Sequence, residues 1–149
     1  KYPSVNLVTV AYGDDLSDKS YREAVGLLKT YPELKVIVSP SSVGIVAAAQ
    51  AVKDQGKIGK VYVTGLGLPS EMAGAVKSGA SKSFAIWNPI DLGYAATYLA
   101  DDLVKGTATK GETSMGRLGK VKLDADGNGA MAEPFVYDAS NIDKFSKIF

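Results

Sequence analysis

Short apolar runs alternate with longer amphipathic stretches between residues 5 and 105. Four runs rich in Val and Ile predict strands, namely VNLVTVA at 5–11, KVIVS at 35–39, KVYVTG at 60–65 and SFAIW at 83–87. Their apolar and polar residues do not alternate strictly, which is typical of strands buried on both faces of a parallel sheet. The sequence therefore predicts a sheet covered by helices on both sides.

Four helices are predicted between and after these strands, within residues 18–32, 42–55, 69–78 and 89–105. The last three are followed by Gly56, Gly79 and Gly106, and glycine suits the left-handed conformation that often ends a helix. Strand, helix and glycine recur at the spacing of βαβ units, whose crossovers are right-handed. The fold class we expect is α/β, with a doubly wound, mostly parallel sheet in three αβα layers.

The division that we expect is an α/β lobe at 1–106 and a tail at 107–149. The tail contains LDADGNG at 123–129, which matches the opening of a calcium-binding EF-hand loop. That loop needs a bidentate Glu at its twelfth position, where Phe135 stands, so calcium is not expected. Gly, Asn and Asp favour a hairpin turn between KVKL and PFVY. A final helix is predicted from about Ser140.

Composition narrows the function. The 149 residues are 46% hydrophobic, enough for one domain or one lobe of a larger protein. Seventeen Lys and Arg against sixteen Asp and Glu, without a basic run, argue against a nucleic-acid partner. Cys and His are absent, which removes disulfides, thiol nucleophiles and the commonest general base and metal ligand. We expect no catalytic residues, no metal and no cofactor, and no apolar run approaches the roughly 20 residues that cross a bilayer.

The acidic loop YGDDLSD at 12–18 allows an enzymatic alternative. Acidic pairs after a first strand help to bind magnesium in phosphoryl-accepting α/β domains, but such a site needs a further carboxylate at another strand end. Ser39, Thr64 and Trp87 occupy those ends. We interpret Asp14, Asp15 and Asp18 as a solvated turn and helix start, which the helix dipole favours. Contact with a ligand cleft is the alternative for them.

The loops that leave the carboxyl ends of parallel strands gather at one edge of the sheet, where ligands bind. Ser39-Pro40 and Asn88-Pro89 each place a helix-capping side chain before a proline suited to the first helical position. The serines at 39, 41 and 42 can cap the helix, line a cleft, or both. Trp87 is the single tryptophan; its ring suits either the core or the apolar face of a sugar.

Four segments carry a family resemblance: VTVAYGDDLSDKSYREAVGLLKTYPELKVIVSPSSVGIVAAAQAV at 8–52, VTGLGLPSEM at 63–72, VKSGASKSFAIWNP at 76–89 and IDKF at 142–145. They resemble the C-terminal half of periplasmic sugar-binding proteins of bacterial ABC importers, and more narrowly the rhamnose-binding and autoinducer-2-binding receptors. The resemblance implies two α/β lobes joined by a hinge, a ligand clamped between them, and a periplasmic location. The implied partners are a small sugar, a membrane permease and an N-terminal lobe. Without that lobe, we expect the tail to be mobile, to fold back or to pair with a neighbouring chain.

By the same resemblance, the loop after the second predicted strand contacts the ligand, which maps onto Pro40 and Ser42. In the wider pattern of sugar receptors, the ligand-binding loop positions fall on Pro40, Leu66 and Trp87. Leu66 stands where ribose-type receptors carry an Asp, which favours a ligand with an apolar edge such as a 6-deoxy sugar. Asn88 follows Trp87 where close relatives usually have Asp; ligand binding and helix capping both stay open for it. The candidate ligand-binding residues are Pro40, Ser41, Ser42, Leu66, Trp87 and Asn88. The alternatives are an autoinducer-2 receptor, and the effector lobe of a sugar-responsive repressor, which needs an upstream helix-turn-helix.

Overall fold

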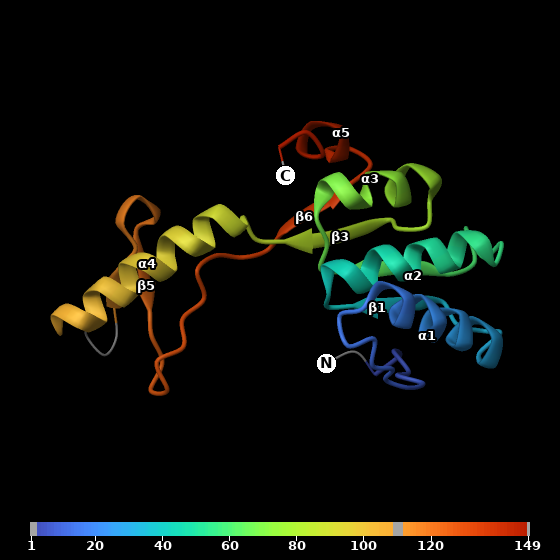
Figure 1. Ribbon diagram of the computed structural model, residues 1–149, viewed down its shortest axis with the longest axis horizontal. Coiled ribbons are helices and arrows are strands. Elements are labelled where there is room, and N and C mark those ends of the chain that lie inside the picture. Colours follow the sequence, from blue (N-terminus) through green and yellow to red (C-terminus); the bar gives the residue numbers. More distant parts are fainter. Residues whose placement is uncertain (1–2, 109–111, 149) are drawn as a thin grey trace. The chain divides into compact units, whose positions relative to one another are not determined.

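The computed structural model describes residues 3–108 and 112–148. The chain forms two compact units, Lys1–Ala85 together with Val136–Phe149, and Ile86–Phe135 (Figure 1). The expected boundary at residue 106 does not coincide with this division, because the helix that precedes it packs within the second unit. The assignment of 1–106 and 107–149 as domains stays a prediction.

The first three strands of the first unit run in parallel. In this unit β1 (Val36–Ser39) pairs with β2 (Tyr62–Gly65), with Ser39 opposite Gly65. A parallel bridge between Leu66 and Ala85 connects the end of β2 to β3 (Ser83–Ile86). On its other edge β3 pairs with β6 (Phe135–Asp138). Three of the four predicted strands are thereby confirmed.

The predicted strand at 5–11 is wrong. These residues have no strand conformation, and Val5, Leu7 and Val10 are 73%, 76% and 61% exposed. The apolar pattern was sufficient to predict a strand, but a strand also needs a neighbour for its backbone N–H and C=O groups. In the described part of the chain, the ladder of β1 is formed with β2.

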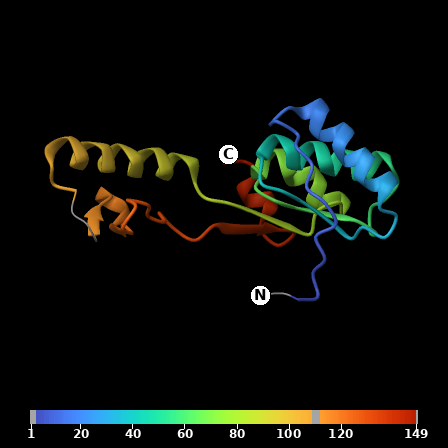
Figure 2. The same cartoon turned by 90° about the horizontal axis from the view of Figure 1, so that it is seen from below.

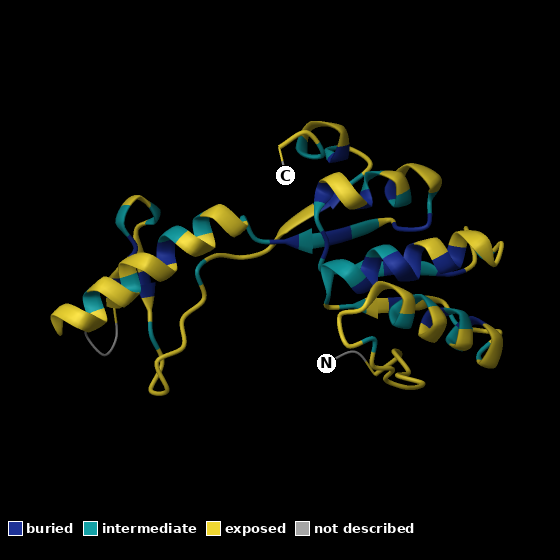
Figure 3. Cartoon of the chain, viewed as in Figure 1, coloured by how far each residue is buried: buried dark blue, intermediate teal, exposed yellow. Residues whose placement is uncertain are grey.

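Helices cover one face of these strands in the first unit. They are α1 (Ser17–Thr30), α2 (Ser42–Asp54), α3 (Pro69–Ser78) and α5 (Ile142–Phe145). Helix α2 packs on β1 and β2, and α1 packs on α2 (Figure 2). Ile37 of β1 and Val63 of β2 are buried, whereas Val36 and Val38 of β1 are exposed. Figure 3 shows that α2 is largely buried and that α1 is more exposed. These helices and strands agree with the expected α/β class.

The C-terminal segment folds back onto the first unit, which is one of the three outcomes expected for the tail. Tyr137 of β6 is buried; its ring stacks on Phe84 with centroids 5.4 Å apart and meets Phe145 edge-on at 5.3 Å. Lys77 of α3 and Asp143 of α5 form an ion pair at 2.6 Å, and this contact lowers the pKa of Asp143.

The second unit is built on α4 (Pro89–Lys105), which packs on β4 (Glu112–Ser114) and the 3₁₀ helix η1 (Gly116–Leu118). Strand β5 (Lys120–Lys122) pairs with β4 in antiparallel fashion. Ala95, Met115 and Val121 form its small buried core.

The predicted hairpin between KVKL and PFVY is therefore wrong in its pairing: the first segment pairs with β4 and the second with β3. The turn itself is present, because the Asp124 carboxylate accepts the N–H groups of Asp126 and Asn128 at 3.0 and 2.8 Å. In its pairing with β4, β5 places Val121 in one buried cluster with Met115.

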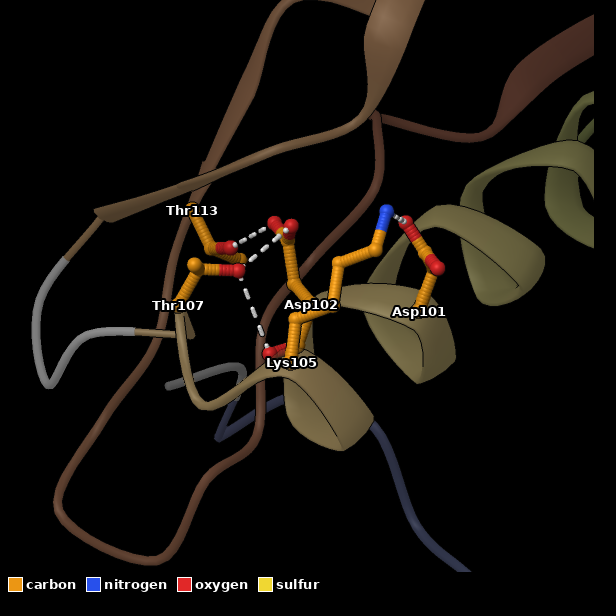
Figure 4. Close-up of polar contacts among 5 residues, drawn as sticks. All are labelled: Asp101, Asp102, Lys105, Thr107 and Thr113. Atoms are coloured by element: carbon orange, nitrogen blue, oxygen red, sulfur yellow. Dashed lines mark hydrogen bonds and ion pairs between the residues drawn. The ribbon is translucent and has the colours of Figure 1, made fainter.

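A carboxylate connects the end of α4 to β4 (Figure 4). Asp102 accepts the hydroxyl protons of Thr113 at 2.7 Å and Thr107 at 3.0 Å. The neighbouring Asp101 accepts a hydrogen bond from Lys105, one helical turn further along α4, at 2.7 Å. Hydrogen bonds from Thr113 and then Thr107 lower the pKa of Asp102, because they stabilise its charged form.

We expect this contact to make the second unit less stable in acid. A carboxylate whose pKa is lowered by folding stabilises the protein above its unfolded pKa of about 3.9, and that contribution is lost as the pH falls through the folded pKa. The difference in thermal unfolding midpoint between the wild type and Asp102→Asn should therefore narrow between pH 7 and pH 3. In a Thr113→Val background the narrowing should be smaller. A difference that does not change with pH would contradict this role.

Candidate functional site

The loop after β1 holds three of the candidate residues, Pro40, Ser41 and Ser42. Ser41, rather than Ser39, is the N-cap of α2: its hydroxyl oxygen accepts the Gly44 N–H at 3.0 Å. The expected cap at Ser39-Pro40 is thus wrong, because α2 begins two residues after Pro40, at the predicted Ser42. The capping that was also expected of Ser41 is confirmed. Pro40 is exposed, and Ser41 and Ser42 are half-buried. The loop presents a proline ring and hydroxyl groups at the start of a helix.

Leu66 is joined to this loop through the backbone. Its N–H donates to the Ser39 carbonyl at 2.9 Å, and its side chain is half-buried. The contact requires Gly65 beside it, whose φ is +135°; a Cβ atom there would lie 1.9 Å from the Ser39 carbonyl oxygen. The ends of β1 and β2 therefore bring together Leu66 and the loop at Pro40–Ser42.

Sequence reasoning missed one participant in this arrangement. The Ser41 hydroxyl donates to the Asp15 carboxylate at 2.5 Å. The acidic loop is exposed, as expected for a solvated turn. No local pattern in the sequence links Asp15 to a serine 26 residues away.

Trp87 and Asn88 belong to the second unit, where both are half-buried. The Asn88 side-chain oxygen accepts the N–H of Ile90 at 3.0 Å and of Asp91 at 3.4 Å, and Pro89 occupies the first turn. The expected helix cap at Asn88 is confirmed. Contact of Trp87 or Asn88 with a ligand stays a prediction.

The four candidate residues of the first unit, Pro40, Ser41, Ser42 and Leu66, carry uncharged side chains. Serine hydroxyls can donate to or accept from ligand hydroxyls, while Pro40 and Leu66 offer apolar contact. Among residues 3–108 and 112–148, no group of three His, Cys, Asp or Glu side chains is placed to hold a metal ion. None of the helices in that same part of the chain is long and apolar enough to cross a membrane.

Residues 1–108 match the family described as a periplasmic binding protein domain. The chain belongs to the periplasmic binding protein family. Its α/β fold is that of one lobe of these two-lobed proteins. The candidate cluster therefore lies at the strand ends of a periplasmic binding protein lobe.

Solved structures of related proteins agree with this assignment. A sugar ABC transporter protein from Actinomyces odontolyticus is 40% identical, with a TM-score of 0.78, over 97% of this chain and 47% of that chain. A solute-binding protein from Clostridium phytofermentans with bound L-rhamnose is 37% identical, with a TM-score of 0.88, over 99% and 51%. The LsrB protein of Clostridium saccharobutylicum, in complex with AI-2, shares the fold at 18% identity, with a TM-score of 0.81, over 97% and 50%. The chain thus spans about half the length of these structures.

Proposed function

We propose that this chain is the C-terminal lobe of a periplasmic solute-binding receptor of a bacterial ABC importer, and that it binds a small rhamnose-like sugar. The observation that carries the proposal is the hydrogen bond from the Leu66 N–H to the Ser39 carbonyl, at 2.9 Å. It brings Pro40, Ser42 and Leu66 to one edge of the strands, where ligands bind in parallel sheets. The 37% identity to a rhamnose-bound protein supports the sugar class.

The proposed receptor clamps its ligand between this lobe and an N-terminal lobe and delivers it to a membrane permease; it has no catalytic role. Autoinducer 2 is the alternative ligand. A repressor lobe is the alternative function, and an upstream helix-turn-helix in place of a signal peptide would favour it.

Calorimetric titration of the two-lobed protein, in which an N-terminal lobe precedes this chain, tests the proposal. We expect L-rhamnose to bind more tightly than D-ribose, because Leu66 offers an apolar contact and no carboxylate for an additional sugar hydroxyl. Binding of autoinducer 2 alone would favour the alternative ligand. Failure to bind any of the three would contradict the proposed ligand class.

Trp87 supplies an optical test of its own place in the site. Since the chain has one tryptophan, and provided that the N-terminal lobe contains none or has its tryptophans replaced by phenylalanine, all emission comes from this ring. Adding L-rhamnose to the two-lobed protein should exclude water from the ring and shift its emission to the blue. The isolated chain should respond weakly, because losing about 4 kcal/mol of contacts turns a ~1 μM site into a ~1 mM one.

Trp87→Phe should weaken binding in the two-lobed protein with a modest loss of stability. Tyr21→Phe is a matched control, since Tyr21 donates to Asp54 at the opposite end of α2; its affinity should not change. Tight binding without a spectral shift, together with unchanged affinity in Trp87→Phe, would place Trp87 outside the site.

A further inference from the structure

The acidic loop contains an uncommon turn. The Leu16 N–H donates to the Gly13 carbonyl at 3.0 Å, and the two central residues, Asp14 and Asp15, have φ of +53° and +56°. Positive φ at both central positions is the pattern of a type I′ turn, which usually carries Asn and Gly. Such conformations cost energy in other residues and persist where surrounding contacts hold them.

The turn directs its two carboxylates to different partners. Asp14 forms an ion pair with Lys19 of α1 at 2.5 Å. Asp15 accepts the hydroxyl proton of Ser41, while the oxygen of the same hydroxyl accepts the Gly44 N–H. A serine hydroxyl has one proton to donate, so the Ser41 proton is committed to Asp15.

We propose that Asp15 is a positioning residue that holds the Ser39–Ser42 loop in its binding conformation. In this proposal Ser41 fixes the loop through its hydrogen bonds to Asp15 and Gly44 and donates no hydrogen bond to the ligand. The carboxylate fixes the rotation of the Ser41 hydroxyl so that its lone pair faces the start of α2. Pro40 and Ser42, on either side of Ser41, are thereby set for ligand contact. This role rests on the proposed function, since Asp15 would hold the loop of the same binding site in place.

Two glycine substitutions in the two-lobed protein separate this role from simple stabilisation. Asp15→Gly relieves the positive φ and removes the contact with Ser41; we expect its unfolding midpoint to be no lower than that of the wild type. Its Kd for L-rhamnose should nevertheless rise about threefold to tenfold, the effect of one net hydrogen bond. Asp14→Gly relieves the same kind of backbone strain in the same turn and should leave the Kd unchanged.

Rescue and coupling give further readouts. Asn tolerates positive φ and keeps a side-chain acceptor, so Asp15→Asn should restore the Kd to within about twofold of the wild type. If Asp15 acts through Ser41, the double variant Asp15→Gly/Ser41→Ala should bind no more weakly than the weaker single variant. Additive effects, or an equal loss in Asp14→Gly and Asp15→Gly, would overturn the inference.

Amide hydrogen exchange tests the loop without any ligand. The Gly44 N–H should exchange about threefold to tenfold faster in Asp15→Gly than in the wild type or in Asp14→Gly. If the wild-type protein binds no sugar, the proposed function fails, and this exchange rate alone decides whether Asp15 positions the loop. Unchanged exchange in Asp15→Gly would reject the positioning role even where sugar binding is confirmed.

Discussion

Replacing Gly65 by alanine is expected to destabilise the protein by about 3–5 kcal/mol, because two independent costs combine at this position. The φ of +135° is rarely adopted by residues with a side chain, and the new Cβ atom would lie 1.9, 2.6 and 2.9 Å from the O, C and N atoms of Ser39. All three are backbone atoms of the paired strand, so no side chain can rotate away. Relief requires β1 and β2 to separate at their carboxyl ends.

Urea unfolding of Gly65→Ala measures this cost, and Gly56→Ala is its matched control. Gly56 also has a positive φ, +62°, but a Cβ atom there would meet nothing within 4 Å. Its substitution should cost only about 1–2 kcal/mol of backbone strain. Affinity for L-rhamnose should fall in Gly65→Ala alone, since this variant moves Ser39 and Leu66. Equal destabilisation in the two variants would show that the overlap at Ser39 is relieved cheaply.

The elements that sequence predicted well are those with local end signals. Helices α3 and α4 occupy the predicted ranges. Helix α3 begins at Pro69 and ends before Gly79, and α4 begins at Pro89 and ends before Gly106; both glycines adopt the left-handed conformation. Such signals act on the residues that carry them, so no knowledge of the rest of the fold is needed.

Strand pairing is the part that sequence could not supply. The apolar run at 5–11 has the composition of a strand, and KVKL and PFVY flank a true turn, yet the first has no ladder and the other two pair elsewhere. Pairing depends on which distant backbone is free to accept a strand. Composition and turn residues carry no information on that.

The candidate site also combines residues that the sequence could indicate with a contact that it could not. Family resemblance indicates Pro40, Ser42, Leu66 and Trp87. The structure places the loops of the first three together through one backbone hydrogen bond, whereas Trp87 belongs to the second unit. The contact between Asp15 and Ser41 spans 26 residues. It depends on a turn in which two aspartates have positive φ. Residues other than glycine seldom adopt this backbone conformation, so the sequence did not predict it.

Phe84→Ala is expected to have the second large effect, a loss of about 3–5 kcal/mol. Phe84 is 2% exposed, and its ring stacks on Tyr137, which in turn meets Phe145. Truncation leaves a cavity at one end of this row of rings and removes the surface on which Tyr137 of β6 stacks, and Tyr137 in turn contacts Phe145 of α5. The C-terminal residues 136–148 should therefore loosen before the rest of the first unit.

Limited proteolysis and urea unfolding together test this order. In Phe84→Ala, cleavage after residue 136 should become faster than cleavage within α2, whose Ile45 and Val52 are fully buried. Phe84→Leu is the matched control, because it keeps most of the apolar volume and should lose roughly 1–2 kcal/mol with little change in proteolysis. If both variants lose equal stability, or if α2 is cut as early as the C-terminal segment, the row of rings does not anchor that segment separately. The ion pair of Lys77 with Asp143 would then be the contact to remove next, since it joins α5 to α3 independently of the rings.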